Sequence, residues 1–406
     1  MKYIVMLGDG MADFPIEELG GKTPLEAAHK PFMDKIAREG RVGMVKTVPD
    51  GMPPQSDTAN LSVMGYDPKI YYTGRSPLEA VSMGIELGEK DVAMRCNLVC
   101  ISEEENYEDA TMVDYSSDEI STEEARILIK YLDEHFHTDE VNLYPGISYR
   151  HCLVLRNSHT GAILTPPHDI SGKPVKEHLP KGEHAELLLG IMKRSYELLK
   201  DHPVNIERKK KGLKPANSCW FWGEGTRPAL TSFEEKYGVK GGVVCAVDLI
   251  KGLGLCAKMA VPNVPGATGG MVTNYAGKGE AALKLLTEGG CDLVYIHVEA
   301  PDESGHRASL KHKISAIEHI DSDILGLLIP ELEKRGEEFS VLLLPDHPTP
   351  LSLMTHIGDP VPFAIYSSSR GLTPHAAAYS ERAAAETGIY EEKGCELMGK
   401  FIRGEF

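Results

Sequence analysis

Residues 3–7 (Tyr-Ile-Val-Met-Leu), followed at once by residues 8–10 (Gly-Asp-Gly), indicate the class of fold to which this chain belongs. A short, continuous apolar run that ends in such a loop is typical of a buried parallel strand. Residues 292–298 (DLVYIHV) and 339–344 (FSVLLL) have the same character, and residues 361–366 form a fourth candidate strand. The chain therefore offers several buried strands that are far apart in sequence.

Helical patterns lie between these apolar runs. Residues 278–287 are rich in Ala, Leu, Lys and Glu, and residues 311–328 place five aliphatic side chains on one stripe of a helix: Ile314, Ile317, Ile320, Ile324 and Leu327. An alternation of strands and helices predicts an α/β fold with a mostly parallel sheet and helices on both of its faces.

The middle of the chain has a different composition. It carries an acidic stretch at 103–108, an amphipathic helix at 122–136, and loops rich in Pro and His at 164–180. The basic run 208–211 is interpreted as a solvated surface turn. We expect residues 92–237 to form a smaller α+β domain, inserted into a discontinuous core made of residues 1–91 and 238–406.

Charge and cysteine content exclude several classes of protein. The 406 residues include 43 Lys and Arg against 60 Asp and Glu, and the resulting net charge of −17 disfavours binding to nucleic acid or to anionic membranes. No apolar run reaches the roughly 18 residues that span a bilayer, and the N-terminus does not resemble a secretion signal. The eight cysteines contain no C-x-x-C pair and are expected to be reduced. We expect a cytoplasmic protein.

Acidic residues and histidines follow the predicted strands. Because sites in open α/β sheets form outside the carboxyl ends of the strands, these side chains are expected at one edge of the sheet. Carboxylates and imidazoles suit Zn²⁺ or Mn²⁺, and the number of ligands favours two metal ions. Taken alone, Asp9 is more typical of a turn or cap residue than of a metal ligand, and His297, inside a strand, is interpreted as a satisfied core residue. The candidate ligands are Asp9, Asp302, His306, Asp346, His347 and His356.

Ser56 is the strongest candidate for a nucleophile. It lies in the segment 53–60 (PPQSDTAN), which leads into an apolar run. A serine hydroxyl needs a metal ion or a base to remove its proton before it can attack. The same segment also reads as a helix cap, and the two interpretations are compatible because a helix N-terminus helps to hold a phosphate group.

Together, these motifs resemble the archaeal-type cofactor-independent phosphoglycerate mutases of the alkaline phosphatase superfamily. The resemblance covers most of the chain and rests on the motifs around the candidate ligands, on Gly65-Tyr66-Asp67-Pro68 and on Tyr72-Thr73-Gly74-Arg75. It implies an alkaline-phosphatase-like core in which Asp302, His306 and His356 hold one metal ion. Asp9, Asp346 and His347 would hold the second, with Ser56 bridging or adjacent as the nucleophile.

The resemblance also implies the reaction. Ser56 would take the phosphoryl group of phosphoglycerate, a small phosphorylated acid, and return it to the other hydroxyl of glycerate. The ions would be Mn²⁺, Zn²⁺ or Co²⁺, and no organic cofactor is expected. Arginine grips carboxylate or phosphate groups well, so the candidates for binding the substrate are Arg150, Arg95, Lys251 and His168, each of which is equally typical of a surface cation or a structural hydrogen bond.

Two alternatives remain at the level of sequence. A subgroup of the same family has been proposed to act as a homoserine kinase, and it would share the metal ligands and the serine. The absence of a recognisable ATP-binding motif favours the mutase. The third hypothesis is a non-catalytic metal-binding protein. The sequence does not indicate an oligomeric state.

Overall fold

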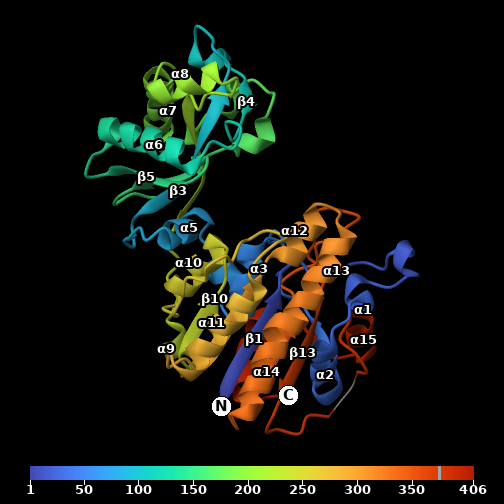
Figure 1. Ribbon diagram of the computed structural model, residues 1–406. Helices are drawn as coiled ribbons and strands as arrows, with labels where there is room; N and C mark the ends of the chain where they lie inside the picture. Colours follow the sequence, from blue (N-terminus) through green and yellow to red (C-terminus); the bar gives the residue numbers. More distant parts are fainter. Residues whose placement is uncertain (374–375) are drawn as a thin grey trace. The chain divides into compact units, whose positions relative to one another are not determined.

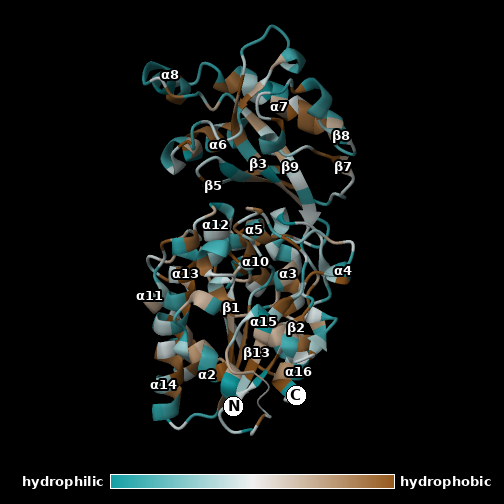
Figure 2. Cartoon of the chain, turned by 90° about the vertical axis from the view of Figure 1, so that its right-hand side faces the viewer, coloured by the Kyte–Doolittle hydropathy of each residue, from teal (hydrophilic) through white to brown (hydrophobic). Residues whose placement is uncertain are grey.

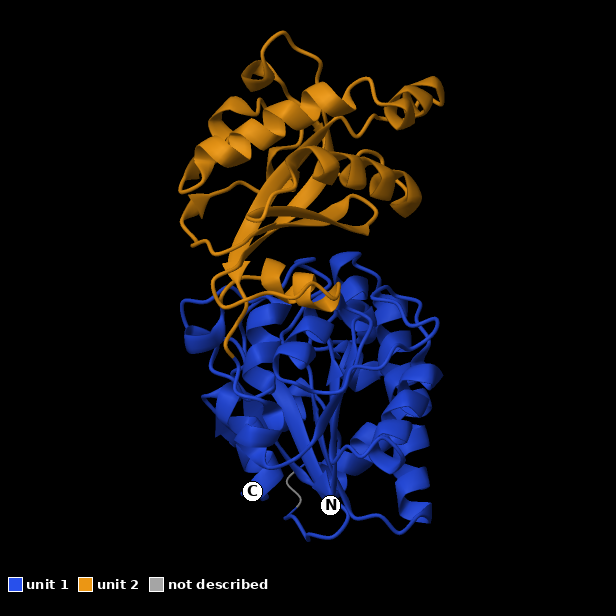
Figure 3. Ribbon diagram, turned by 90° about the vertical axis from the view of Figure 1, so that its left-hand side faces the viewer, with its two compact units in different colours: residues 1–72, 230–406 blue, residues 73–229 orange. Residues whose placement is uncertain are grey.

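The computed structural model describes residues 1–373 and 376–406 and divides the chain into two compact units. Unit 1 comprises Met1–Tyr72 and Leu230–Phe406, and unit 2 comprises Thr73–Ala229 (Figure 3). Residues 73–91 thus lie in unit 2 and residues 230–237 in unit 1, the reverse of their expected assignment. The reason at the first boundary is helix α5 (Ser76–Ser82), which packs against two strands of unit 2, β3 (Val92–Ile101) and β9 (Ser218–Thr226).

Unit 1 is built around a seven-stranded sheet of order β10-β11-β1-β12-β13-β2-β14. The pairings from β10 to β12 are all parallel, whereas β13 is antiparallel to both β12 and β2. The predicted α/β class with a mostly parallel sheet is therefore confirmed. The strands are β1 (Lys2–Gly8), β2 (Arg41–Val45), β10 (Gly241–Val244), β11 (Leu293–Val298), β12 (Phe339–Leu344), β13 (Val361–Ser367) and β14 (Tyr390–Glu391).

Helices cover both faces of this sheet, as the alternation of side chains along β1 requires. Ile4 and Met6 point into a buried cluster shared with the helices on one face, whereas Tyr3 points to the other face and meets Phe401, with ring centroids 5.5 Å apart. The apolar strands are brown in Figure 2. The helices of the first face include α2 (Pro31–Glu39), α11 (Tyr275–Thr287), α13 (Leu310–His319), the π-helical η5 (Ile320–Leu325) and α14 (Gly326–Lys334).

The remaining helices of unit 1 have ten residues or fewer, and several of them are labelled in Figure 1. These remaining helices are η1 (Glu17–Leu19), α1 (Pro24–Ala27), α3 (Ser56–Val63), α4 (Pro68–Tyr71), α9 (Phe233–Tyr237), α10 (Asp248–Cys256), α12 (Ala300–His306), α15 (Glu381–Glu386) and α16 (Gly394–Arg403). Helix α16 packs against α3, on the face of the sheet opposite Ile4 and Met6.

The directions of the strands bring the ends of five strands to one edge of the sheet. β1, β11 and β12 are parallel, so their carboxyl ends lie at the same edge. β13 runs the other way and begins there, and β2, antiparallel to β13, ends there. The residues that follow β1, β2, β11 and β12, and those that precede β13, are therefore neighbours in space.

Unit 2 contains a five-stranded antiparallel sheet in which β9 and β6 (Arg150–Leu155) flank β3. The sheet is completed by β4 (Met112–Asp114) and β5 (Val141–Ile147), and β7 (Ala162–Ile163) pairs separately with β8 (Lys181–Gly182). Its helices are α6 (Thr122–Phe136), α7 (Ala185–Leu199) and α8 (Pro203–Lys210), with short turns η2 (Tyr107–Asp109), η3 (Pro167–Ile170) and η4 (Lys176–His178).

The basic run 208–211 is exposed at Lys209, Lys210 and Lys211, as expected, but it ends helix α8 and Arg208 is not solvated. Arg208 is buried, with its guanidinium 2.6 Å from a carboxylate oxygen of Glu124. Charge density along the sequence does not show which cation has a buried partner. Within the described residues, every helix is too short or too polar to cross a bilayer.

Candidate active site

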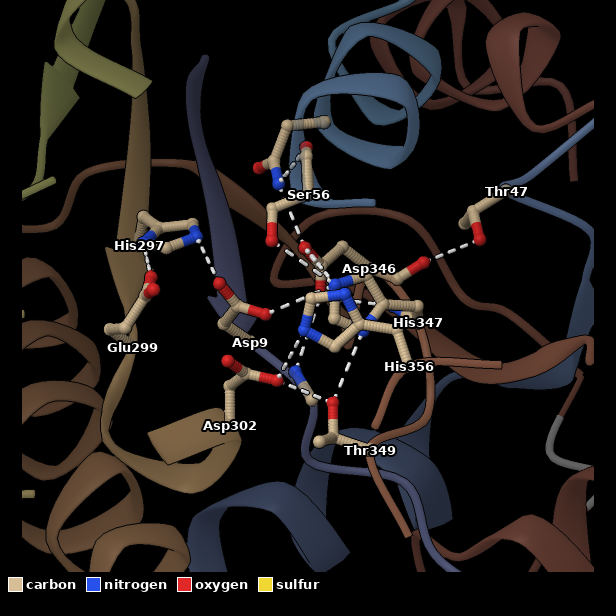
Figure 4. A network of polar contacts seen from close by, with 12 residues as sticks. Asp9, Thr47, Ser56, His297, Glu299, Asp302, Asp346, His347, Thr349 and His356 are labelled. Atoms are coloured by element: carbon tan, nitrogen blue, oxygen red, sulfur yellow. Dashed lines mark hydrogen bonds and ion pairs between the residues drawn. The ribbon is translucent and has the colours of Figure 1, made fainter. Parts of the chain in front are cut away.

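Ser56 is the first residue of α3, which follows β2 at the common edge of the sheet. Gln55 precedes it as the cap residue and makes no side-chain capping hydrogen bond, so the structure does not use Ser56 as an N-cap. Its Oγ lies 3.2 Å from Nε2 of His347, and its carbonyl oxygen accepts a hydrogen bond of 2.8 Å from the side chain of Asn60 (Figure 4). The hydroxyl is thus half-buried and directed at the cluster of candidate ligands.

Asp9, Asp346 and His347 form the group next to Ser56. Nε2 of His347 lies 3.5 Å from Oδ1 of Asp9 and 3.5 Å from Oδ2 of Asp346, and all three side chains are fully buried. Among the described residues, neither carboxylate oxygen of Asp9 has a hydrogen-bond partner. A buried carboxylate without donors is costly unless a cation is bound to it.

Asp302, His306 and His356 form the second group. Nε2 of His306 and Nε2 of His356 are 2.8 Å apart, and each lies 3.2 Å from an oxygen of Asp302. Asp302 and His306 lie one turn apart on α12, as their spacing predicts. Nδ1 of His306 lies 3.0 Å from the carbonyl oxygen of Met354, so this nitrogen carries a hydrogen and Nε2 is the nitrogen that can bind a metal ion.

Burial and neighbouring charges shift the titration of these groups in opposite directions. Burial, and then the charge of Asp346, raises the pKa of Asp9 well above its usual value. Burial lowers the pKa of His347. For Asp302, burial acts to raise the pKa, but hydrogen bonds to His306 and His356 outweigh it and lower the value. The hydrogen bond to Asp302 raises the pKa of His306 to about 9.

The separations between the donor atoms of the six side chains suit bound metal ions better than they suit direct contacts among the side chains. Donors around a tetrahedral metal ion with bonds of about 2.0–2.1 Å lie roughly 3.3 Å apart, which is close to the separations of 2.8 and 3.2 Å in the second group. Asp9 with Asp346 and His347, and Asp302 with His356 and His347, are both groups whose ligand atoms lie within 4.8 Å of one another. Since imidazole nitrogens and carboxylate oxygens suit Zn²⁺ and Mn²⁺, the donor set passes this test.

Three supporting residues were not predicted from the sequence. Asn60 donates a hydrogen bond of 2.8 Å to Oδ2 of Asp346 and accepts one of 2.6 Å from the hydroxyl of Tyr295. Thr349 donates its hydroxyl hydrogen to Oδ1 of Asp302. Asn60 lies four residues after Ser56 on α3, so helical spacing from the nucleophile candidate is the signal by which it was discoverable.

Lys313 anchors two of the loops that carry candidate ligands. It is fully buried on α13, and its Nζ lies 2.7 Å from Oδ2 of Asp13 and 2.8 Å from the carbonyl oxygen of Thr349. Asp13 also accepts hydrogen bonds from the backbone of Leu351. The ammonium group thus ties the loop after β1 to the loop between β12 and β13.

His297 and Glu299 also lie beside the site. Nε2 of His297 is 3.0 Å from Oδ2 of Asp9, and its Nδ1 is 3.8 Å from Oε2 of Glu299. His297 is fully buried, as expected for a strand residue, but neither ring nitrogen forms a hydrogen bond with any described residue. The interpretation of His297 as a satisfied core residue is therefore wrong, because inward-facing strand positions at the carboxyl edge also face the site.

In unit 2, the candidates for binding substrate lie along one row of aromatic rings. The guanidinium of Arg150 lies 5.5 Å from the ring centre of Tyr149, and that of Arg95 lies 4.4 Å from the ring centre of Trp222. Tyr115 contacts Tyr149 at one end, and His168 joins Tyr115 to Trp222, with ring centroids 5.1–6.0 Å apart along the row. Three of the four candidates therefore lie in one cluster.

The four candidates differ in how they are already engaged. Arg95 forms a two-point ion pair with Glu79, whereas Arg150 is exposed and has no ion pair with the described residues. His168 is about half exposed, 3.7 Å from a carboxylate oxygen of Asp169. Lys251 lies on α10 of unit 1, 3.6 Å from a carboxylate oxygen of Asp248.

Comparisons with known proteins agree on one family. A family model described as 2,3-bisphosphoglycerate-independent phosphoglycerate mutase matches residues 37–205. A protein of that name from Methanothrix thermoacetophila is 52% identical over 404 residues, covering 100% of both chains. Another from Methanosarcina barkeri is 48% identical over 406 residues, again covering 100% of both chains.

Solved structures support the same fold. A protein from Pyrococcus horikoshii superposes with a TM-score of 0.82 and 30% identity, covering 99% of this chain and 97% of that one. A cofactor-independent phosphoglycerate mutase from Thermoplasma acidophilum has a TM-score of 0.67 at 24% identity and covers 99% of both chains. At that identity, the second likeness concerns the fold alone.

Proposed function

The chain belongs to the family of 2,3-bisphosphoglycerate-independent phosphoglycerate mutases, and from this premise we propose that it interconverts 3-phosphoglycerate and 2-phosphoglycerate through a phosphoserine at Ser56. The observation that carries the proposal is the convergence of Ser56, three carboxylates and three imidazoles at one edge of the sheet, with Ser56 Oγ 3.2 Å from His347. The substrate is a small phosphorylated acid, as in the name of the family.

The family depends on metal ions, and two divalent ions fit the donors of this chain. We assign Asp302, His306 and His356 to one ion and Asp9, Asp346, His347 and Ser56 to the other. Mn²⁺, Zn²⁺ and Co²⁺ all suit these ligands. When bound, such a pair lowers the pKa of the serine hydroxyl and stabilises charge on the attacking and leaving oxygens.

Ser56 Oγ loses its proton and attacks phosphorus, and the bond between phosphorus and the C3 oxygen breaks. That oxygen takes up a proton, which leaves free glycerate and phosphoserine. The glycerate then turns, its C2 oxygen attacks the same phosphorus with loss of a proton, and Ser56 is released. One bond to phosphorus forms and one breaks in each half, so no net water, nucleotide or bisphosphoglycerate is consumed.

Residues of this chain also prepare the serine and the phosphate. Asn60 holds the Ser56 backbone and the Asp346 carboxylate, each at 2.8 Å, and so sets the distance between nucleophile and ligand. The backbone N–H groups of the first turn of α3 favour the negative charge of a phosphate. Arg150, Arg95, His168 and Lys251 are proposed to bind the carboxylate and phosphate of the substrate, with Arg150 first because it is exposed.

The test is conversion of 3-phosphoglycerate to 2-phosphoglycerate, read through an enolase, with added Mn²⁺ and without bisphosphoglycerate or nucleotide. The wild-type protein should turn over, and Ser56→Ala should lose activity by about 10⁴-fold or more. Ser322→Ala, an exposed serine of the same unit, is the matched control. Mass spectrometry of the quenched enzyme should find phosphate on Ser56. A silent mutase assay together with ATP-dependent phosphorylation of homoserine would contradict the proposal.

A further inference from the structure

Tyr295 is a buried residue of β11 whose hydroxyl group reaches the helix that carries Ser56. The hydroxyl donates a hydrogen bond of 2.6 Å to Oδ1 of Asn60, which follows Ser56 by one helical turn on α3. Both side chains are fully buried. The backbone of Tyr295 is held on two sides, because β11 pairs with β1 at Val5 and with β10 at Val243. The phenol is therefore attached to a rigid part of the sheet.

The amide group of Asn60 has one orientation that satisfies its neighbours. Its Nδ2 donates to the carbonyl oxygen of Ser56 and to Oδ2 of Asp346, each at 2.8 Å. A carbonyl group and an ionised carboxylate accept hydrogen bonds but do not donate them, so both require the NH₂ end of the amide. The oxygen end is left for a donor, and the hydroxyl of Tyr295 is that donor. If the amide turned over, its oxygen would face the carboxylate and two acceptors would lie in contact.

The same amide fixes one oxygen of Asp346. Oδ1 of this carboxylate accepts hydrogen bonds from the backbone N–H groups of Gly10, at 3.2 Å, and His347, at 2.9 Å. Oδ2 accepts from Asn60 and lies 3.5 Å from Nε2 of His347, on the side of the candidate ligands. Because Asn60 also holds the carbonyl group of Ser56, one buried side chain sets the nucleophile relative to a ligand.

The hydroxyl of Tyr295 keeps the hydrogen that this arrangement needs. Burial, and then the charge of Asp346, raises the pKa of Tyr295 well above its usual value, so the phenol is neutral at neutral pH. Without that hydrogen, the oxygen of Asn60 would be buried without a donor, which is unfavourable and favours rotation of the amide.

We propose that Tyr295 is a positioning residue for phosphoryl transfer, which acts by fixing the orientation of the Asn60 amide and, through it, the position of Ser56 relative to Asp346. The proposal rests on the proposed function for the roles of Ser56 and Asp346. Loss of a residue that orients a metal ligand typically costs about 10–100-fold in activity or metal affinity. A displaced nucleophile slows the chemical step, so the loss is expected in kcat and not in KM.

The first experiment compares two tyrosines that each lose only a hydroxyl group. Tyr295→Phe should lower kcat by about 10–100-fold, leave KM within about twofold, and weaken binding of one Mn²⁺ ion to metal-free protein by about tenfold. Tyr3→Phe is the matched control, because Tyr3 is also buried and its hydroxyl donates a hydrogen bond of 3.0 Å to the carbonyl oxygen of Ile402. It should lose a similar amount of stability in urea and keep both kcat and Mn²⁺ affinity.

A double-mutant cycle tests whether Tyr295 acts through the amide. Asn60→Ala and the double variant Asn60→Ala/Tyr295→Phe should have the same kcat and the same Mn²⁺ affinity, because the hydroxyl has no amide left to orient. Additive losses would overturn the proposal, as would an unchanged kcat in Tyr295→Phe or an equal loss of kcat in Tyr3→Phe.

Failure of the proposal differs from failure of the proposed function. Normal mutase activity in both the wild-type protein and Tyr295→Phe refutes the positioning role alone. A metal-loaded wild-type protein without turnover counts against the mutase, and Mn²⁺ affinity then decides the role of Tyr295. An affinity in Tyr295→Phe equal to that of the wild-type protein would overturn the role, whereas a tenfold loss that disappears in the Asn60→Ala background would support it.

Discussion

Two charged clusters, one in each unit, differ in whether the protein itself supplies partners for their charged groups. In unit 1, two imidazole nitrogens face each other at 2.8 Å beside Asp302, and Asp9 is buried without a hydrogen bond from the described residues. In unit 2, the guanidinium of Arg95 is neutralised by Glu79 and lies over the ring of Trp222. The first cluster is incomplete without an added cation, and the second is complete within the protein.

This difference distinguishes residues that bind an ion or a substrate from residues that stabilise the fold. A donor group that the protein leaves unsatisfied is available to an ion or a substrate, whereas a satisfied ion pair mainly stabilises the fold. By this criterion the ligands of unit 1 and the exposed Arg150 are binding residues. Arg95, which Glu79 already neutralises, is the weaker of the two arginine candidates for binding substrate.

The largest effect is expected from removal of a ligand in unit 1. His356→Ala should lower kcat/KM by about 10³-fold or more, because the remaining donors hold a cation poorly and charge on the transferring phosphoryl group is less well stabilised. The measurement is the enolase-coupled rate together with metal content. His312→Ala is the control, and a near-normal rate with full metal content in His356→Ala would show that the ligand assignment is incorrect.

The next effect is a dependence of metal affinity on pH. Because the hydrogen bond to Asp302 raises the pKa of His306 to about 9, metal-free protein at pH 7 carries a proton that the ion must displace. Apparent Mn²⁺ affinity should therefore fall by about 50-fold from pH 9 to pH 7, with a slope that approaches tenfold per pH unit below the pKa. Titration of metal-free protein at several pH values measures this.

The stability of the metal-free fold changes with pH in the opposite direction from the metal affinity. The raised pKa of His306 stabilises the metal-free fold fully below its unfolded value of 6.5, and this contribution is lost as the pH rises through about 9. The melting temperature of metal-free protein should show this loss, and that of metal-loaded protein should not.

An apparent Mn²⁺ affinity that is the same at pH 7 and pH 9 would contradict the competition between the proton and the metal ion at His306.

A smaller effect separates the two arginines of unit 2. Arg150→Ala should raise KM for 3-phosphoglycerate by roughly 10–50-fold, as expected for loss of a charge-assisted contact, and should leave stability unchanged. Glu79→Gln should instead destabilise unit 2 by about 1–3 kcal/mol, because it leaves the partly buried Arg95 without its counter-ion. Both tryptophans of the chain, Trp220 and Trp222, lie on β9, so their fluorescence reports the unfolding of unit 2.

The comparison fails if the two variants exchange their effects. A stability loss in Arg150→Ala with unchanged KM would make Arg150 a structural cation. A raised KM with unchanged stability in Glu79→Gln would place Arg95 at the substrate.

The smallest effect concerns Asp114 of unit 2. Burial acts to raise its pKa, but hydrogen bonds from Lys214 and Ser116 outweigh this and lower the pKa from 3.8 to about 2. Asp114 therefore stabilises the fold above pH 3.8, and this contribution is lost as the pH falls through about 2. Asp114→Asn should cost about 1 kcal/mol at pH 7 and much less at pH 2, measured by urea unfolding with tryptophan fluorescence. Equal costs at both pH values would contradict the prediction.

Much of the fold was predictable because periodicity reports burial directly. Residues 339–344 and 122–136 form β12 and α6 with the bounds that their patterns predict. The longer apolar stripe at 311–328 was predicted as one helix, but the structure divides it among α13, η5 and α14. The boundary between the units was less predictable, since α5 is assigned by what it packs against and not by its composition.

The sequence by itself determined the residue types that meet at the edge of the sheet. Strands that run parallel must end at the same side, so Asp9, Asp302 and Asp346 were predictable neighbours. Only the tertiary structure decided which buried polar group finds a partner within the protein. Glu79 pairs with Arg95 across 16 residues and Lys313 with Asp13 across 300, whereas His297 beside Asp9 makes no hydrogen bond with the described residues. Burial follows from local patterning, but satisfaction of a buried charge depends on atoms that only the folded chain brings within 3 Å.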